Sequence, residues 1–141
     1  MKKIIITNSV EETLQWGEEL GKSSIMGDVF ALNGELGVGK TVVAKGIAKG
    51  LGINEEITSP SFVLLEIYPN KLPLYHFDLY RIDSEIEFDR LNFEEYWRGD
   101  GISVIEWAEK ADIRLPENSI KIKIEWLDSD KRRIEIEYPD N

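Results

Sequence analysis

Apolar residues change their spacing several times along this chain, and each spacing predicts a different element. Short apolar runs at 4–7 and 29–32 have strand character. Behind each run, apolar residues recur at helical intervals, which predicts helices over 10–21 and 42–51. The N-terminal part therefore alternates strands with helices, a pattern typical of an α/β domain.

Residues at the ends of the two predicted helices support their placement. Ser9 and Glu12 stand three positions apart at the start of the first helix, where they form a capping box. Gly21 and Gly52 lie where the periodic stretches end, and glycine commonly ends a helix. We therefore expect the first helix to end near Gly21 and the second at Gly52.

The middle of the chain has mostly strand character. Two runs at 62–68 and 74–80 flank the turn-forming segment 69–73, which predicts a hairpin with a loop. The acidic and aromatic segment 83–98 is predicted to be helical. The apolar run 102–105 is predicted to be a buried strand.

Two C-terminal segments show a clear alternation of apolar and polar residues. They cover 120–126 and 134–138, with a turn around Ser129 between them. Such alternation is typical of antiparallel strands with one buried and one solvated face. The sequence thus predicts one α/β domain over 1–141, with a mixed, partly antiparallel central sheet flanked by helices.

Length and composition indicate a globular protein. A chain of 141 residues with 42% hydrophobic residues is long enough for one domain with its own core. No apolar stretch approaches the roughly 20 residues of a membrane helix, and the N-terminus has no signal-peptide pattern. Because cysteine is absent and His76 is the only histidine, thiolate and multi-histidine metal sites are excluded. We expect a soluble, cytoplasmic protein with no membrane partner.

The charge of the chain bears on its partners. A formal net charge of −10 argues against strong direct binding to nucleic acid, which requires basic surface. Acidic residues are concentrated in the segment 83–100, where aromatic and apolar residues are interspersed. This segment is interpreted either as a solvated face or as a docking surface for a basic partner.

The strongest chemical signal is the segment Gly34–Thr41, which reads G-E-L-G-V-G-K-T. It matches the phosphate-loop pattern, in which a glycine-rich loop joins a strand to a helix. Backbone N–H groups and the helix start then cradle phosphates, Lys40 reaches the β- and γ-phosphates, and the Thr41 hydroxyl binds Mg²⁺. A chance glycine-rich turn is the alternative. The strand before the loop and the helix after it favour a nucleoside triphosphate site, and therefore a P-loop NTPase domain.

A magnesium–triphosphate site also needs a carboxylate at the end of a buried strand. Glu106 follows the run 102–105, and Asp78 lies in another largely apolar strand. Each could instead cap neighbouring backbone, and the pattern alone favours Glu106 because its strand is more uniformly apolar. His76 is interpreted as a packed core histidine, and a functional role as a base is the less favoured alternative. The hydroxyls of 58–61 either sense the γ-phosphate or form a turn before the next strand.

Several further motifs make the chain similar to a known family. In sequence order they are E-E-T-L at 11–14, the phosphate loop at 34–41, T-S-P-S-F at 58–62, Y-H-F-D-L-Y-R at 75–81, E-F-D-R-L-N-F-E-E-Y at 87–96 and I-E-W-A at 105–108. With these motifs the chain resembles the TsaE family, the bacterial ATPase of the tRNA threonylcarbamoyladenosine pathway. The resemblance covers nearly the whole length, and Y-H-F-D-L-Y-R together with I-E-W is its specific part.

The resemblance implies a role in making N6-threonylcarbamoyladenosine in tRNAs that read codons beginning with A. It implies an ATPase that uses ATP and Mg²⁺ and does not itself transfer the threonylcarbamoyl group. Instead, the ATPase acts on a heterodimer of the transferase subunit and its inactive paralogue, of the TsaD–TsaB type. Contact with tRNA is then indirect, through this complex, which agrees with the acidic charge.

The resemblance also implies roles for individual residues. Lys40, Asp78 and Glu106 are the candidate catalytic residues, and Asp78 is expected near the γ-phosphate. Thr41 and Glu106 are expected to hold Mg²⁺. The candidate nucleotide contacts in and beside the loop are Glu35, Leu36, Gly37, Val38, Gly39, Lys40, Thr41 and Val42.

Two candidate nucleotide contacts lie outside the loop, and one loop position departs from the family. Thr13 and Arg132 match positions near the nucleotide in relatives. Arg132 belongs to the basic triplet 131–133, which is otherwise typical of a solvated turn. Val42 stands where many relatives carry threonine or serine, so one possible phosphate contact is lost while Mg²⁺ binding is retained.

Two other nucleotide-dependent functions compete with this interpretation. A small-molecule kinase uses the same loop but usually gathers arginines over the transferring phosphate, and the arginines here are scattered along the sequence. A GTPase commonly carries N-K-x-D, and the stretch 70–73 lacks the aspartate. Because no residue is an obvious transition-state arginine, we expect slow hydrolysis by the isolated chain and stimulation by a partner.

Overall fold

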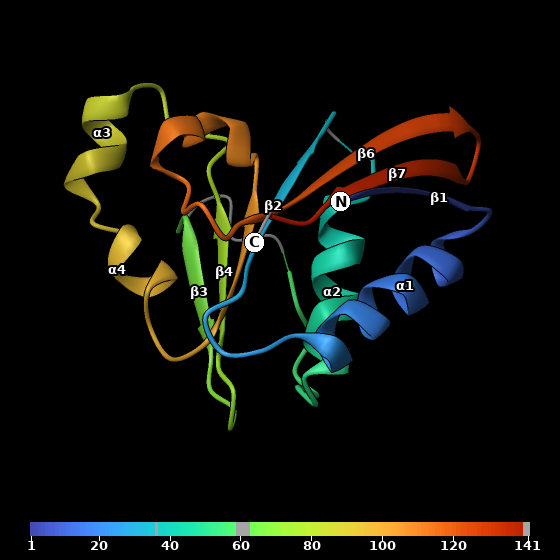
Figure 1. The fold of residues 1–141 in the computed structure, drawn as a ribbon, viewed down its shortest axis with the longest axis horizontal. Coiled ribbons are helices and arrows are strands. Elements are labelled where there is room, and N and C mark those ends of the chain that lie inside the picture. Colours follow the sequence, from blue (N-terminus) through green and yellow to red (C-terminus); the bar gives the residue numbers. More distant parts are fainter. Residues whose placement is uncertain (36, 59–62, 140–141) are drawn as a thin grey trace.

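The computed structural model describes residues 1–35, 37–58 and 63–139. Within these residues the main element is a seven-stranded sheet with the order β1-β7-β6-β2-β5-β4-β3 (Figure 1). The strands are β1 (Lys2–Thr7), β2 (Val29–Gly34), β3 (Leu65–Tyr68), β4 (Leu74–Asp78), β5 (Ile102–Glu106), β6 (Ile120–Asp128) and β7 (Lys131–Glu137). The α-helices are α1 (Val10–Ser23), α2 (Lys40–Gly50), α3 (Glu85–Arg90) and α4 (Glu94–Trp97), and two 3₁₀ turns are η1 (Ala108–Lys110) and η2 (Asp112–Arg114).

The sheet is mixed, as the sequence predicts. Strand β2 is parallel to both β5 and β6, and β4 is parallel to β5. The remaining pairs β1–β7, β6–β7 and β3–β4 are antiparallel. The alternating segments at the C-terminus thus form the expected antiparallel pair, and the run at 102–105 forms the buried strand β5.

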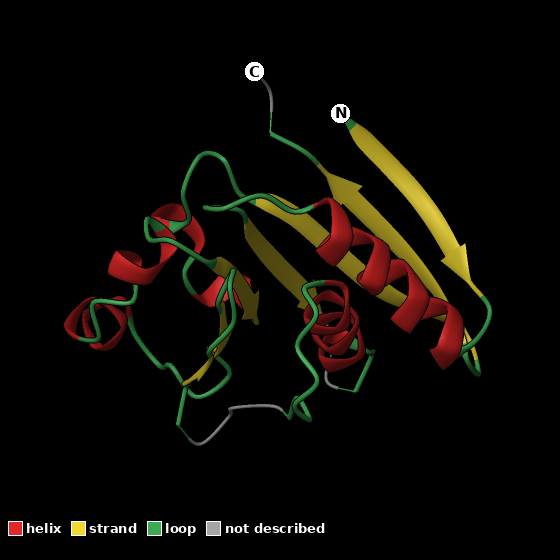
Figure 2. Cartoon of the chain, turned by 90° about the horizontal axis from the view of Figure 1, so that it is seen from below, coloured by secondary structure: helices red, strands yellow, loops and turns green. Residues whose placement is uncertain are grey.

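Helices cover the two faces of the sheet at different places. Apolar residues of α2 pack with Phe30, Leu32 and Val104 on one face. Residues of α3 and α4, such as Phe88 and Trp97, pack with other sheet residues on the opposite face. Figures 1 and 2 show α1 and α2 against one another, apart from α3 and α4. No helix of the described segments has the length and apolar character to cross a membrane.

Helices α1 and α2 cross at two pairs of glycines. A Cβ atom placed on Gly46 would lie 2.8 Å from the Cα atom of Gly17, and one on Gly50 would lie 2.8 Å from that of Gly21. Helix α1 ends at Ser23, two residues past Gly21, which agrees with the expected end near Gly21. Gly21 lets two backbones approach closely and does not end the helix.

The capping signals of α1 and α2 are confirmed in part. The Ser9 side chain accepts a hydrogen bond from the N–H of Glu12 at 3.1 Å, as a capping box requires. The Glu12 carboxylate, however, accepts from the N–H of Asn8 at 2.9 Å. Helix α2 ends before Gly52, whose φ of +86° suits glycine.

Two further predictions need correction. The segment 83–98 is not one helix but the two short helices α3 and α4, and Asn92 between them has a φ of +53°. The first hairpin strand begins only at Leu65, after Leu64 with a φ of +69°, and its predicted start at Phe62 lies outside the described residues.

Candidate phosphate and metal site

The loop between β2 and α2 has the backbone geometry that its glycines predict. Gly37 and Gly39 have φ values of +78° and +120°, which side chains other than glycine rarely adopt. Gly39 is also the N-cap of α2, and no side chain caps the N–H groups of this helix start. The positive end of α2 therefore faces the loop with backbone donors available to an anion. Leu36 lies outside the described residues.

Lys40 is held inside the loop. Its Nζ donates to the carbonyl oxygens of Gly34 at 2.5 Å and Glu35 at 2.9 Å, and lies 3.9 Å from the ring centroid of Trp107. Burial lowers the pKa of Lys40, while the charges of Glu106, Glu109 and Asp78 act in the opposite direction. The cation is thus largely desolvated and surrounded by carbonyl oxygens and acids, a position from which it can bind phosphate oxygens.

Both candidate acids lie at the same end of the sheet. Asp78 and Glu106 are directly opposite one another in the parallel pair β4–β5, and Leu32 of β2 is the partner of Glu106 on its other side. Ligands of open α/β sheets bind at the carboxyl ends of the strands, where these acids stand beside the phosphate loop. The sheet register therefore brings together residues that are far apart in the sequence.

Thr41 and Glu106 touch each other across this end of the sheet. The Thr41 hydroxyl donates to Oε1 of Glu106 at 2.9 Å. Asp78 lies nearby with its Oδ1 accepting from the Tyr80 N–H at 2.9 Å. A hydroxyl and a carboxylate suit Mg²⁺, which takes one or two protein oxygens and completes its shell with phosphates and water. Among the described residues no cluster of three or more His, Cys, Asp or Glu side chains could hold a metal alone.

Two adjoining cavities surround the loop. The larger, about 330 Å³, is lined by Gly37, Gly39, Lys40, Thr41, Val42, Asp78, Glu106 and Trp107. The smaller, about 120 Å³, is lined by Val10, Thr13, Gly37, Val38, Gly39, Val42, Asp130 and Arg132. The structure therefore brings every described candidate except Glu35 to one of these cavities, and Glu35 contributes its carbonyl to Lys40.

The two candidates outside the loop, Thr13 and Arg132, reach it from different elements. Arg132 of β7 donates from Nε to the carbonyl of Val38 at 2.7 Å and has its guanidinium 5.5 Å from the Trp126 ring centroid. Thr13 of α1 is buried and shares a 2.7 Å hydrogen bond with Thr7. Arg132 is thus not part of a fully solvated turn, because it fastens β7 to the phosphate loop.

Sequence reasoning missed one contact in the site. His76 is fully buried, as a core histidine should be, but its Nε2 lies 2.6 Å from Oε2 of Glu106. Two facts could have indicated this contact: His76 is two residues before Asp78, and alternate residues of a strand share a face. What the sequence could not supply is the pairing of β4 with β5.

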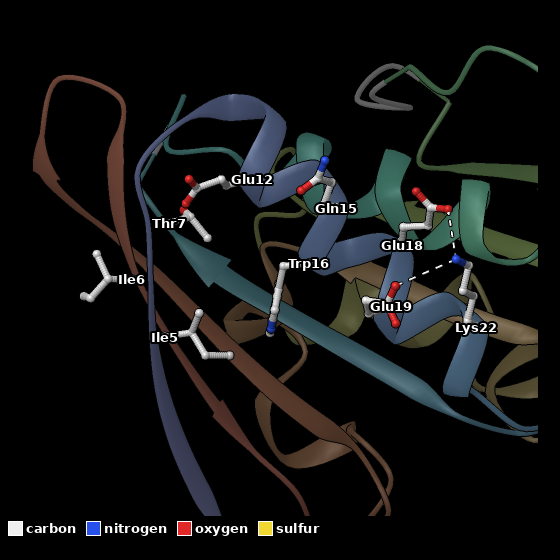
Figure 3. A pocket seen from close by; sticks show the side chains of 9 residues that line it. All are labelled: Ile5, Ile6, Thr7, Glu12, Gln15, Trp16, Glu18, Glu19 and Lys22. Carbon is white, nitrogen blue, oxygen red and sulfur yellow. Dashed lines mark ion pairs between the residues drawn. The ribbon is translucent and has the colours of Figure 1, made fainter.

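A larger hollow lies elsewhere, between β1 and α1 (Figure 3). It measures about 430 Å³, and its lining includes Glu12, Glu18 and Glu19. Lys22 forms ion pairs with Glu18 at 3.4 Å and with Glu19 at 3.7 Å, drawn as dashed lines in Figure 3. An acidic lining without a glycine loop repels phosphates, so we place the candidate site at the cavity of about 330 Å³ beside the phosphate loop.

Comparison with known proteins gives the family. A family model described as "Threonylcarbamoyl adenosine biosynthesis protein TsaE" matches residues 7–134. The chain belongs to the TsaE family. Among curated members named tRNA threonylcarbamoyladenosine biosynthesis protein TsaE, that of Treponema pallidum is 41% identical over 131 residues, which are 93% of this chain and 97% of the relative. That of Nostoc sp. is 40% identical over 141 residues, with 96% and 85% covered.

A solved structure confirms the fold expected of a TsaE protein. YdiB of Bacillus subtilis matches with a TM-score of 0.86 and 32% sequence identity, covering 100% of this chain and 88% of that one. The α/β architecture with a mixed sheet and helices is therefore confirmed as a P-loop NTPase fold of the TsaE type. Membership in the TsaE family and this fold support an ATPase-type activity.

Proposed function

We propose that this protein binds ATP with Mg²⁺ at the phosphate loop, hydrolyses it slowly, and thereby supports threonylcarbamoyladenosine formation in tRNA. The observation that carries the proposal is the convergence of Lys40, Thr41, Asp78 and Glu106 on one cavity of about 330 Å³. Its relatives are named for this tRNA modification, which supports the assignment of the pathway. The activity belongs in the cytoplasm, where ATP and tRNA are available.

Each residue of the site has a chemical task in this proposal. Lys40 exchanges its two carbonyl acceptors for phosphate oxygens, which are stronger acceptors because they are charged. Thr41 and Glu106 are the protein ligands for Mg²⁺, which when bound neutralises charge on the β- and γ-phosphates. Asp78 stands beside Glu106 and faces the same cavity, so we assign it to the γ-phosphate end. Thr13 and Arg132 line the adjoining cavity and are assigned to the nucleoside side.

We propose slow hydrolysis because the cavity of about 330 Å³ lacks an arginine among its described lining residues. Arg132 is bound to the Val38 carbonyl, Arg114 pairs with Glu85 and Asp89, and Arg133 pairs with Glu125. An arginine supplied by a partner can raise phosphoryl-transfer rates on the order of 10³-fold or more. We therefore propose that a transferase heterodimer of the TsaD–TsaB type completes the site.

The test is hydrolysis of ATP by the pure protein with and without that heterodimer. We expect a low basal rate, a marked stimulation by the heterodimer, and loss of both in Lys40→Ala. Lys45→Ala is the matched control, because Lys45 is exposed on the same helix away from the cavity. Rapid turnover by the isolated chain, or no nucleotide binding with the heterodimer present, would refute the proposal. Phosphate transfer to a metabolite acceptor would favour the kinase alternative instead.

Some acidic residues of the segment 83–100 have a structural role. Arg114 pairs with Glu85 and Asp89 and lowers the pKa of Asp89 through its hydrogen bond. Asp100 accepts a hydrogen bond from the Tyr75 hydroxyl at 2.7 Å. We propose that the exposed acids of this segment that lie outside these pairs face the partner complex in competition with tRNA. Undiminished tRNA binding by the heterodimer at saturating concentrations of this protein would contradict that proposal.

A further inference from the structure

The carboxylate of Glu106 is held from two sides. On one side the Thr41 hydroxyl lies 2.9 Å from Oε1 and 3.2 Å from Oε2, so its shorter contact is with Oε1. On the other side Nε2 of His76 lies 2.6 Å from Oε2. His76 and Asp78 project to the same face of β4, and the neighbouring strand β5 places Val104 opposite His76 and Glu106 opposite Asp78. The imidazole therefore lies between the sheet and α2, one register pair further from the strand ends than Asp78 and Glu106.

The chemistry of this contact fixes the form of the imidazole. An ionised carboxylate only accepts hydrogen bonds, so the contact with Glu106 places the proton on Nε2 of His76. The other ring nitrogen, Nδ1, is buried and has no hydrogen-bond partner among the described residues. A buried nitrogen without a partner costs stability, and an apolar side chain at the same depth would avoid this cost. The hydrogen bond from Nε2 to Glu106 is therefore the advantage that a histidine has over an apolar side chain at this position.

We propose that His76 is the positioning residue of the metal ligand Glu106, an inference that rests on the proposed Mg²⁺–nucleotide site. The Nε2–H of His76 holds Oε2, so that Oε1 is the oxygen nearer to the Thr41 hydroxyl at the start of α2. Hydrogen bonds to a ligating carboxylate fix its orientation, and losing such a partner typically weakens metal binding by about 10–100-fold.

Two amide variants of different length separate positioning from packing alone. The amide nitrogen of glutamine is as many bonds from Cα as Nε2 of histidine, so His76→Gln can still donate to Glu106. His76→Asn carries the same amide one methylene shorter and cannot reach. The measurement is the dissociation constant for a non-hydrolysable ATP analogue, by calorimetry, with and without Mg²⁺.

We expect His76→Asn to reduce the gain in affinity given by Mg²⁺ by about 10–100-fold, and His76→Gln to stay within a few-fold of wild type. The affinity without Mg²⁺ should change little in either variant. Equal behaviour of the two variants would overturn the proposal. If wild-type protein binds the analogue equally well without Mg²⁺, the metal site on which the proposal rests is refuted, and the proposal with it. If wild-type protein does not bind the analogue at all, the proposed function is refuted.

A second measurement keeps His76 in place and therefore does not depend on whether the His76 variants fold. His76 is the only histidine of the 141 residues, so histidine-labelled protein gives one imidazole spin system. We expect nitrogen NMR to show the proton on Nε2, protected from solvent, and expect Glu106→Gln to shift this signal. A proton on Nδ1, or a signal that Glu106→Gln leaves in place, would contradict the contact.

Discussion

The crossing of α1 and α2 makes a sharp prediction about Gly46. At an exposed position inside a helix, replacing glycine by alanine stabilises the folded protein by about 1 kcal/mol. At Gly46 the added Cβ would lie 2.4 Å from the carbonyl oxygen of Leu14 and 2.8 Å from the Cα of Gly17. Both atoms belong to the backbone of α1, so no side chain can rotate away. We therefore expect Gly46→Ala to destabilise the protein.

The size of the effect follows from the distance that α1 must move. Ordinary van der Waals contact begins at 3.4 Å, so α1 has to shift by about 1 Å away from Gly46. Overpacking of this kind costs typically about 1–3 kcal/mol, and we take the upper end because backbone must move along the whole crossing. After the gain in helix propensity of about 1 kcal/mol, a net loss of about 2 kcal/mol remains. For this chain length it lowers Tm by roughly 6–10 °C.

Thermal and urea unfolding followed by circular dichroism measure this loss. Lys45→Ala, at the exposed neighbouring position of α2, controls for the effect of an alanine in the helix without a change at the crossing. The control should keep Tm within a few degrees of wild type. A Gly46→Ala variant that is as stable as wild type, or more stable, would refute the close backbone contact between α1 and α2.

The remaining predictions concern the site and one pH-dependent pair. Lys40→Ala should weaken nucleotide binding about 10–100-fold in calorimetry while the fold is retained, because a charged hydrogen bond to phosphate is worth about 1.5–3 kcal/mol. Glu106→Ala should abolish the gain in affinity from Mg²⁺ but leave metal-free binding intact. Asp78→Ala should lower turnover more than binding, and unfolding of this variant would show a structural role. The hydrogen bond to Asp100, with burial, raises the pKa of Tyr75 to about 12 from 10.0, and a raised pKa adds stability at low pH that is lost as the group ionises. The stability difference between wild type and Asp100→Ala, measured by urea unfolding, should therefore shrink between pH 10 and 12, and a constant difference would contradict this.

The features that the sequence predicts well are those encoded in contiguous residues. The phosphate loop is one segment, and its glycines need positive φ angles for a local reason. The buried strand at 102–105 and the antiparallel pair near the C-terminus are visible as an apolar run and as alternation. In each case the information lies within about ten residues, where periodicity acts directly.

The features that the sequence does not reveal depend on which elements meet. From the sequence, Gly21 has the usual role of glycine at a helix end, because nothing local distinguishes that role from close packing against Gly50. His76 in an apolar strand has the pattern of any core residue, and its contact with Glu106 requires the β4–β5 pairing. Arg132 likewise looks like part of a basic turn until β7 is placed beside the phosphate loop.

The two acids illustrate this limit in the site itself. From the sequence, Asp78 and Glu106 are alternatives, and the more uniformly apolar strand favours Glu106. In the structure they are register partners on adjacent parallel strands, so both lie within reach of the cavity. What distinguishes them is their contacts, because Glu106 bonds Thr41 at the first turn of α2 while Asp78 accepts from the Tyr80 N–H. In the proposed site, Glu106 is assigned as the metal ligand because its carboxylate meets the helix start, and the apolar composition of its strand agrees with this assignment without being its cause.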